Sequence, residues 1–147
     1  MKAIIIILLF GISFSYNPGA AITYARKYCN YPNPGNYDYY RSGENAHFVS
    51  ECLAAGGQRF DGCSGLNSKG MFHSVGYLKN CLLSKGWKLS KSRSTNYKAG
   101  YPIFLKGGNH AMLITGFDGD DIIFCSHEKD RCDAKIKAYS VDYYYKY

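Results

Sequence analysis

The sequence lacks the features that mark several common classes of binding protein. It has no Cys-x-x-Cys pair, and its histidines do not fall at the paired spacings of zinc ligands: His47, His73, His110 and His127. We therefore expect neither a metal nor a cofactor. No internal repeat or linker divides the chain, which favours one domain. No nucleic-acid recognition motif accompanies its basic residues, so nucleic acid is not an expected partner.

Long apolar runs are also absent, apart from one at the start of the chain. Lys2 precedes an apolar segment from Ala3 to Ile12, and the small residues Ser13 and Ser15 fit a cleavage site. This pattern is typical of a secretory signal peptide, and the run is shorter than the roughly 20 apolar residues of a membrane span. We expect residues 1–15 to be a signal peptide and residues 16–147 to be a secreted domain, soluble and without stable membrane insertion.

Six cysteines lie in this exported chain, an even number in an oxidising compartment. Disulfides are therefore expected, without a reactive thiol, and the candidates are Cys29, Cys52, Cys63, Cys81, Cys125 and Cys132. Such a set allows many pairings, and the sequence does not choose among them.

The chain is basic, with a formal charge of +7; loss of Lys2 with the signal peptide leaves 7 − 1 = +6. The charge suits solubility, or attraction to an anionic surface such as a bacterial wall or lipid headgroups. The 15 tyrosines suit stacking on sugar rings or amphipathic positions at the rim of the core. We expect a monomer whose partners are peptidoglycan peptides or other anionic cell-surface material.

The order of local patterns predicts an α+β fold. Helical spacing and capping residues predict helices over 18–28, over a segment that contains Asn45 and stops at Gly56, and from Ser74 to Gly86. Short segments rich in β-formers then predict strands over 101–105, 110–117, 121–125 and 134–139. Helices followed by antiparallel strands indicate N-terminal helices packed on a small antiparallel sheet.

The hairpin between the two middle strands predicts how two histidines lie. Asp-Gly between apolar runs is a strong turn signal, so we place the turn at Asp118 and Gly119. Counting back along both strands then sets His110 opposite His127, on one face of the sheet and toward the second helix. A turn of another length would shift the register and separate the two side chains, leaving two ordinary surface histidines.

These elements resemble the parts of a thiol hydrolase. A helix N-terminus favours a thiolate, and a nearby imidazole, held by a third polar group, accepts its proton. The second helix and His110 supply the first two parts, and the hairpin count suggests His127 as the third. No sulfur stands at the start of the helix.

Four segments of the chain resemble parts of one known family. They are the opening "YNPGAAITYARKYCNYPNPGNYDYY", then "GENAHFVSECLAAGG", "NHAMLITGF" and "CSHEKDR". The family is the putative amidase domain family of the papain-like NlpC/P60 group. The resemblance extends over most of 16–147. It implies a papain-like α+β fold and cleavage of amide bonds, typically in peptidoglycan peptides, by a Cys-His-polar triad. His110 matches the strand histidine of that family.

The sequence departs from this family at the nucleophile. Aligned without a gap, Asn45 replaces the cysteine; alternatively, one residue is missing between Asn45 and Ala46. A side-chain amide is not a useful nucleophile, and Cys52 lies about two helical turns further on, too far to replace it.

Three hypotheses about function follow. The first is a secreted amidase-like protein that binds cell-wall peptides or glycans but is catalytically impaired by Asn45. The second is an active cysteine amidase or endopeptidase acting on peptidoglycan, whose sequence here carries a change. The third is a non-enzymatic, cationic binding protein stabilised by disulfides.

Overall fold

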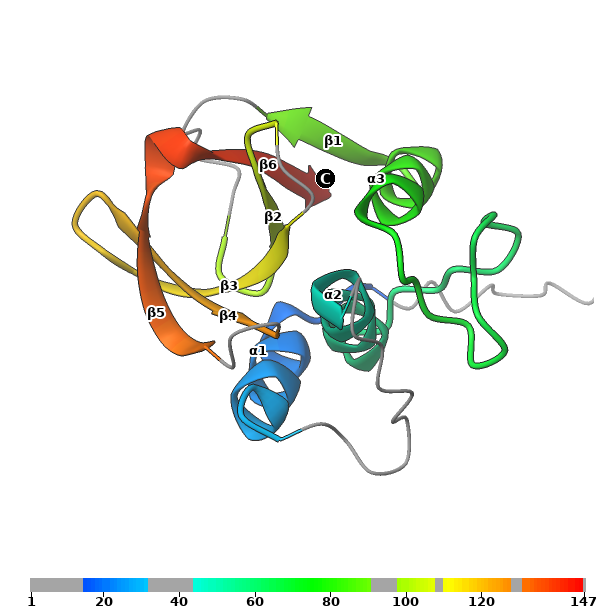
Figure 1. The fold of residues 1–147 in the computed structure, drawn as a ribbon, viewed down its shortest axis with the longest axis horizontal. Helices are drawn as coiled ribbons and strands as arrows, with labels where there is room; N and C mark the ends of the chain where they lie inside the picture. The colour runs from blue at the N-terminus through cyan, green and yellow to red at the C-terminus, as the bar shows by residue number, and fades with distance from the viewer. Residues whose placement is uncertain (1–14, 32–43, 91–97, 108–109, 128–130, 147) are drawn as a thin grey trace, which may run out of the picture.

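The computed structural model describes residues 15–31, 44–90, 98–107, 110–127 and 131–146. These residues form an α+β fold in which helices precede an antiparallel sheet, as the sequence predicts (Figure 1). The helices are α1 (Pro18–Tyr28), α2 (Glu44–Ala55) and α3 (Val75–Ser84). The strands are β1 (Trp87–Ser90), β2 (Pro102–Leu105), β3 (Ala111–Asp118), β4 (Asp121–Ser126), β5 (Arg131–Lys137) and β6 (Val141–Lys146), with a 3-10 turn at Ala138–Ser140 before β6.

Side-chain caps fix the starts of two helices at the predicted places. The Asn17 side chain accepts a hydrogen bond from the Ala20 N–H, and Pro18 follows at the first helical position, where its missing N–H costs nothing. The Ser74 side chain accepts from the Tyr77 N–H in the same way at α3. The predicted bounds of α1 are therefore confirmed, and α2 contains Asn45 in its first turn.

The sheet among the described residues has six strands in the order β1-β6-β2-β3-β4-β5, and each neighbouring pair is antiparallel. β1 and β6 were not expected from the sequence. β1 has four residues with two exposed positions, so it shows little apolar alternation. The predicted strand over 134–139 is β5, displaced toward the N-terminus.

The predicted turn of the β3–β4 hairpin is wrong by one residue. Asp118 pairs with Asp121, so the turn residues are Gly119 and Asp120 rather than Asp118 and Gly119. Gly119 has φ +56°, whereas Asp120 is not among the residues with positive φ, which is the pattern of a type II′ turn with glycine first. An Asp-Gly pair at both turn positions would instead have required the type I′ geometry.

A bulge changes the register again further along this hairpin. The register shifts between Ile114 and Gly116, and beyond the shift Leu113 pairs with Cys125. The predicted register pairs Leu113 with Phe124, and it is this register that sets His110 opposite His127. The predicted pairing of the two histidines across the hairpin is therefore wrong, because the turn lies one residue later than predicted and the prediction did not include the bulge.

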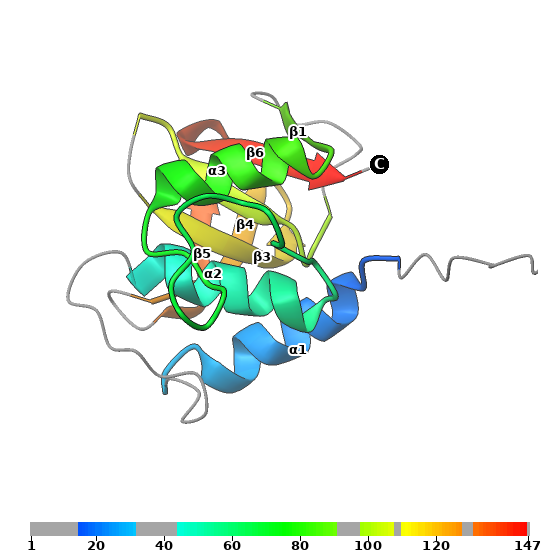
Figure 2. The same ribbon diagram turned by 90° about the vertical axis from the view of Figure 1, so that its right-hand side faces the viewer.

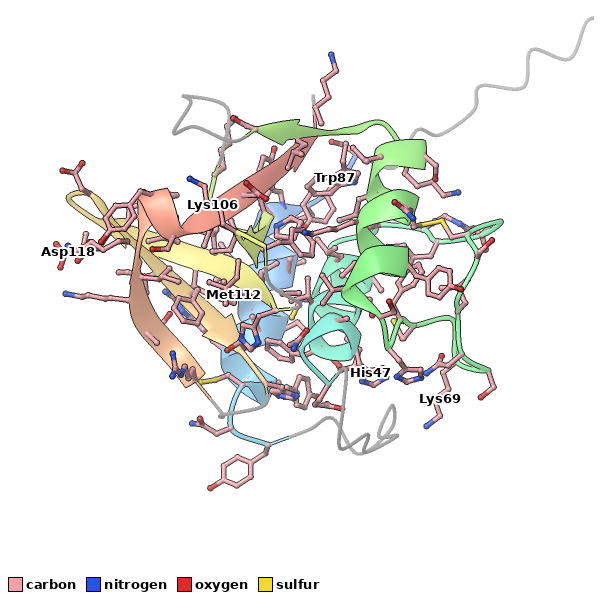
Figure 3. All side chains as sticks on the ribbon, turned by 45° about the horizontal axis from the view of Figure 1, so that its top comes forward. His47, Lys69, Trp87, Lys106, Met112 and Asp118 are labelled. Atoms are coloured by element: carbon pink, nitrogen blue, oxygen red, sulfur yellow. A yellow bond between two sulfur atoms is a disulfide. The ribbon has the colours of Figure 1, made fainter. Side chains whose placement is uncertain are left out.

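The helices bring the site to one side of the sheet. α1 and α2 lie side by side, and α2 contacts β3, while α3 contacts β1 (Figures 1 and 2). Figure 3 marks His47 on α2 and Asp118 at the outer end of the β3–β4 hairpin, which points away from α2. The site described below therefore lies at the opposite end of β3 from the turn.

The core between these layers is apolar and continuous. Fully buried residues come from all three helices, from the edge strand β1 and from the inner strands, and the largest side chains among them include Phe48, Leu78, Trp87, Phe104 and Phe124. Burial of this apolar area is the main favourable term that holds α2 against the sheet.

The predicted signal peptide lies outside the described residues except for Ser15. Of the helices in the described part of the chain, none combines the length and the apolar character needed to cross a bilayer.

Candidate functional site

The first turn of α2 presents Asn45 to the beginning of β3. The Asn45 side chain is almost fully buried, with a residue exposure of 1%. Its Nδ2 lies 3.2 Å from Nδ1 of His110, and its Oδ1 accepts a hydrogen bond of 3.3 Å from the Ala111 N–H. The structure thus brings together two of the predicted site residues, one from a helix N-terminus and one from a strand.

The hydrogen bond from Ala111 determines which ring nitrogen of the neutral His110 carries the proton. A backbone N–H can only donate, so the Asn45 atom facing Ala111 is the carbonyl oxygen, and the amide nitrogen faces His110. An amide NH2 group also only donates, so Nδ1 of His110 must accept. The neutral imidazole of His110 is therefore the tautomer with its proton on Nε2.

His127 lies at the same end of α2 but has different partners. Its Nδ1 is 3.0 Å from Oε1 of Glu44, and its Nε2 is 2.7 Å from the carbonyl oxygen of Tyr28. The ring of Phe48 stacks on the imidazole at a centroid distance of 4.1 Å. Carboxylate and carbonyl oxygens are both acceptors, so the arrangement favours the doubly protonated imidazolium.

Glu44 is the negative partner of this cation. Burial disfavours its charged form, but the hydrogen bond from His127 and the nearby imidazole of His47 outweigh burial and lower the pKa of Glu44 to about 2. Nδ1 of His47 lies 3.8 Å from the same carboxylate oxygen. The side chain is a buried acceptor that joins α2 to His127 and, through it, to the end of α1.

The sequence predicts that His127 orients His110, and this prediction rests on the hairpin register. The observed register does not pair the two histidines, so it does not support that role. The two ring nitrogens of His127 contact Glu44 and Tyr28. Both histidines do lie at the start of α2. Glu44 was missed as a site residue; its position directly before Asn45 is the signal that could have identified it.

One protein family matches the chain over a range that contains every described residue. The model of the family described as a putative amidase domain matches residues 15–147. The chain belongs to this family. No curated protein and no solved structure matches the chain.

Two free thiols, those of Cys52 and Cys125, lie among the described residues of this domain. Neither thiol forms a hydrogen bond with His110 in this part of the chain. Cys52 is fully buried in α2, and burial raises the pKa of its thiol well above the usual range. Cys125 is also buried, and burial again raises its pKa. A protonated, solvent-excluded thiol is a poor nucleophile, so both suit a place in the core of the amidase domain.

The disulfides of the amidase domain correct the prediction that all its cysteines are paired. Cys29 pairs with Cys132 and Cys63 pairs with Cys81, whereas Cys52 and Cys125 remain free and buried. The even number of cysteines does not force complete pairing, because a cysteine in the core can serve as a small apolar residue.

Only one group of described residues in the amidase domain has the geometry to hold a metal ion. It consists of Cys29, Cys125 and Cys132, whose sulfur atoms lie within 4.8 Å of one another. Two of these sulfurs are joined in a disulfide, which removes them as thiolate ligands.

Proposed function

We propose that this amidase domain binds amide-containing cell-wall fragments at the start of α2 without hydrolysing them. The observation that carries the proposal is the contact between Asn45 and His110. The name of the family implies amide cleavage. In this chain a buried carboxamide lies 3.2 Å from the imidazole, at a helix N-terminus that would stabilise the thiolate form of a cysteine.

The chemistry of the carboxamide argues against covalent catalysis. Its nitrogen lone pair is delocalised into the carbonyl group, so it cannot attack a substrate amide at useful rates. Its nitrogen also donates to His110, which occupies the imidazole atom that a thiol would use as its base. The site therefore retains a base beside a helix N-terminus but has no group for the base to activate.

The contact also favours substitution over deletion. Asn45 itself faces His110 from an unbroken helix, so residue 45 corresponds to the nucleophile position without a gap. We also propose that the α+β fold is of the papain-like, NlpC/P60 type. It is supported by a helix whose first turn meets a histidine at the start of an antiparallel strand.

The cell-wall substrate class and secretion rest on other features. The apolar start of the chain favours export, and the two disulfides suit an oxidising compartment. The positive net charge favours association with anionic wall material. Binding to such material is the role that remains when the nucleophile is absent.

A restoration experiment tests the proposal. The native protein should bind purified muropeptides but give no hydrolysis, and Asn45→Cys should restore a weak hydrolysis that a thiol-blocking reagent abolishes. The matched control is Asn45→Ser, which has a similar size but a far weaker nucleophile at this position. A second control, Asn45→Cys combined with His110→Ala, should be inactive because the thiol loses its base.

The result that would overturn the proposal is hydrolysis by the native protein. Turnover at enzyme-like rates, abolished by His110→Ala, would show that another nucleophile acts at this site. Absence of muropeptide binding by the folded native protein would equally contradict the binding role.

A further inference from the structure

A second cluster of reactive groups lies apart from the Asn45–His110 contact, where α1 meets β4 and β5. Cys29 follows the last residue of α1, Cys125 lies in β4 and Cys132 lies in β5. Their three sulfur atoms lie within 4.8 Å of one another, with Cys29 and Cys132 joined and Cys125 free. A free thiol thus lies next to a disulfide inside one packed unit.

A bulge in β5 makes Cys125 a neighbour of Cys132. Phe124 pairs with Ala134 and Ser126 pairs with Arg131, so the single residue Cys125 faces two residues, Cys132 and Asp133. Asp133 has φ +49°, and its N–H donates to Sγ of Cys125 at 3.4 Å. The backbone of the bulge therefore holds the free thiol against the strand that carries half of the disulfide.

We propose that Cys29, Cys125 and Cys132 form a thiol–disulfide exchange site in which one disulfide moves between the pairings Cys29–Cys132 and Cys125–Cys132. The thiol of Cys125 loses its proton to solvent, and the thiolate attacks Sγ of Cys132. A new S–S bond forms, the bond from Cys132 to Cys29 breaks, and Cys29 leaves as a thiolate that takes up a proton. The exchange needs no external oxidant or reductant, because one disulfide and one thiol are present before and after.

The fold can keep α1 in place while the disulfide moves. The Arg26 guanidinium donates to the carbonyl oxygen of Thr115 and pairs with Asp133 at 3.3 Å, and Asp133 also accepts from the Thr115 hydroxyl. The Tyr28 carbonyl is held by His127. These contacts tie α1 to β3, β4 and β5 independently of the disulfide, so exchange releases one covalent tether without requiring α1 to leave the sheet.

The surroundings of Cys125 predict that exchange is slow at neutral pH and faster at alkaline pH. Burial raises the pKa of this thiol; the Asp133 N–H and the Thr115 hydroxyl favour the thiolate, the Asp133 carboxylate disfavours it and Arg26 of α1 favours it. The thiolate, which is the attacking species, therefore forms mainly at high pH.

Disulfide mapping of the full mature chain tests the exchange. The unreduced native protein is held at neutral or alkaline pH, quenched with acid, unfolded, blocked with N-ethylmaleimide and digested with trypsin. Cleavage after Lys27, Arg41, Lys106, Lys129 and Arg131 puts the three cysteines on separate peptides. We expect a Cys125–Cys132 peptide beside the Cys29–Cys132 peptide, several-fold more abundant after alkaline incubation.

Three variants separate exchange from general scrambling. Cys125→Ser should give only Cys29–Cys132, whereas Cys52→Ser, which removes the other buried thiol, should leave the exchange unchanged. Cys29→Ser, oxidised with a glutathione redox pair, should form Cys125–Cys132 while Cys63–Cys81 stays intact. If Cys29→Ser does not fold, the mapping of the native protein decides alone.

Two results would overturn the exchange site. One is native protein that yields only Cys29–Cys132 at every pH at which it remains folded. The other is a pairing pattern in which Cys52 exchanges as readily as Cys125, because that would indicate unfolding and non-specific scrambling.

Discussion

At the scale of single residues, the carboxamide of Asn45 has one acceptor oxygen and one donor nitrogen, and its neighbours accept one orientation. The Ala111 N–H donates to the oxygen, and the nitrogen donates to Nδ1 of His110. The identity of one side chain thus sets the tautomer of the neutral histidine, and under the proposed function the same side chain stands where a nucleophile would.

The tautomer can be measured directly. We expect nitrogen-15 NMR, recorded with the imidazole of His110 in its neutral form, to show the proton of His110 on Nε2, with Nδ1 unprotonated. Asn45→Ala removes the donor that enforces this tautomer, so the variant should show a larger share of the Nδ1–H form. A native spectrum dominated by the Nδ1–H form would contradict the hydrogen bond from Asn45.

The buried pair of Glu44 and His127 predicts acid sensitivity. The folded-state pKa of Glu44, about 2, is below its ordinary value of 4.5, so its contribution to stability is fully present above pH 4.5 and is lost as the pH falls toward 2. We expect a loss on the order of 2 kcal/mol in the free energy of unfolding across this window. His127 adds nothing there, because it is protonated in both states.

The matched control for this prediction replaces both members of the pair, Glu44→Gln together with His127→Gln. Urea unfolding at several acidic pH values should show that the native protein loses more stability than the double variant by roughly that amount. Equal losses would mean that Glu44 is not held ionised by His127.

At the scale of elements, the turn of the β3–β4 hairpin predicts a difference between two glycines. Gly119 has φ +56°, so Gly119→Ala should lower the free energy of unfolding by about 1–2 kcal/mol. Gly116 lies in β3 without positive φ, and an added methyl group would lie 3.7 Å from Ile123, an ordinary contact. Gly116→Ala should therefore change stability little, and similar unfolding midpoints for both variants would argue against the type II′ turn.

The same elements show which parts of the fold follow from local sequence. Asn17, Pro18 and Ser74 fix helix starts through contacts within three residues, so α1 and α3 are predictable. The hairpin register depends on which of two adjacent residue pairs forms the turn and on whether a bulge is present. The side chains of the hairpin do not distinguish these alternatives. β1 is short and shows its strand character only when paired with β6.

The candidate site divides along the same line. Asn45 and His110 could be predicted together because a helix N-terminus and a strand histidine are both local features. The partnership of Glu44 with His127 could not, because it depends on how closely the start of α2 approaches the end of β4. Long-range approach of this kind leaves no periodic signal in the sequence.

At the scale of the whole molecule, the two disulfides tie different parts of the fold. Cys29–Cys132 closes a sequence separation of 103 residues and joins α1 to β5, whereas Cys63–Cys81 closes 18 residues and joins the loop before α3 to that helix. Each restricts the unfolded chain, with typical stabilisation of about 2–4 kcal/mol. Cys52 and Cys125 are left as buried thiols.

This division predicts the thiol count of the mature protein. Unfolded without reductant, it should react with two equivalents of a thiol reagent, and folded it should react slowly, because both free thiols are buried. Cys52→Ser and Cys125→Ser should each lower the count by one. Exchange among Cys29, Cys125 and Cys132 does not alter the total, since one thiol remains whichever pair is joined. A count of zero would therefore mean that Cys52 and Cys125 find partners that the fold does not give them.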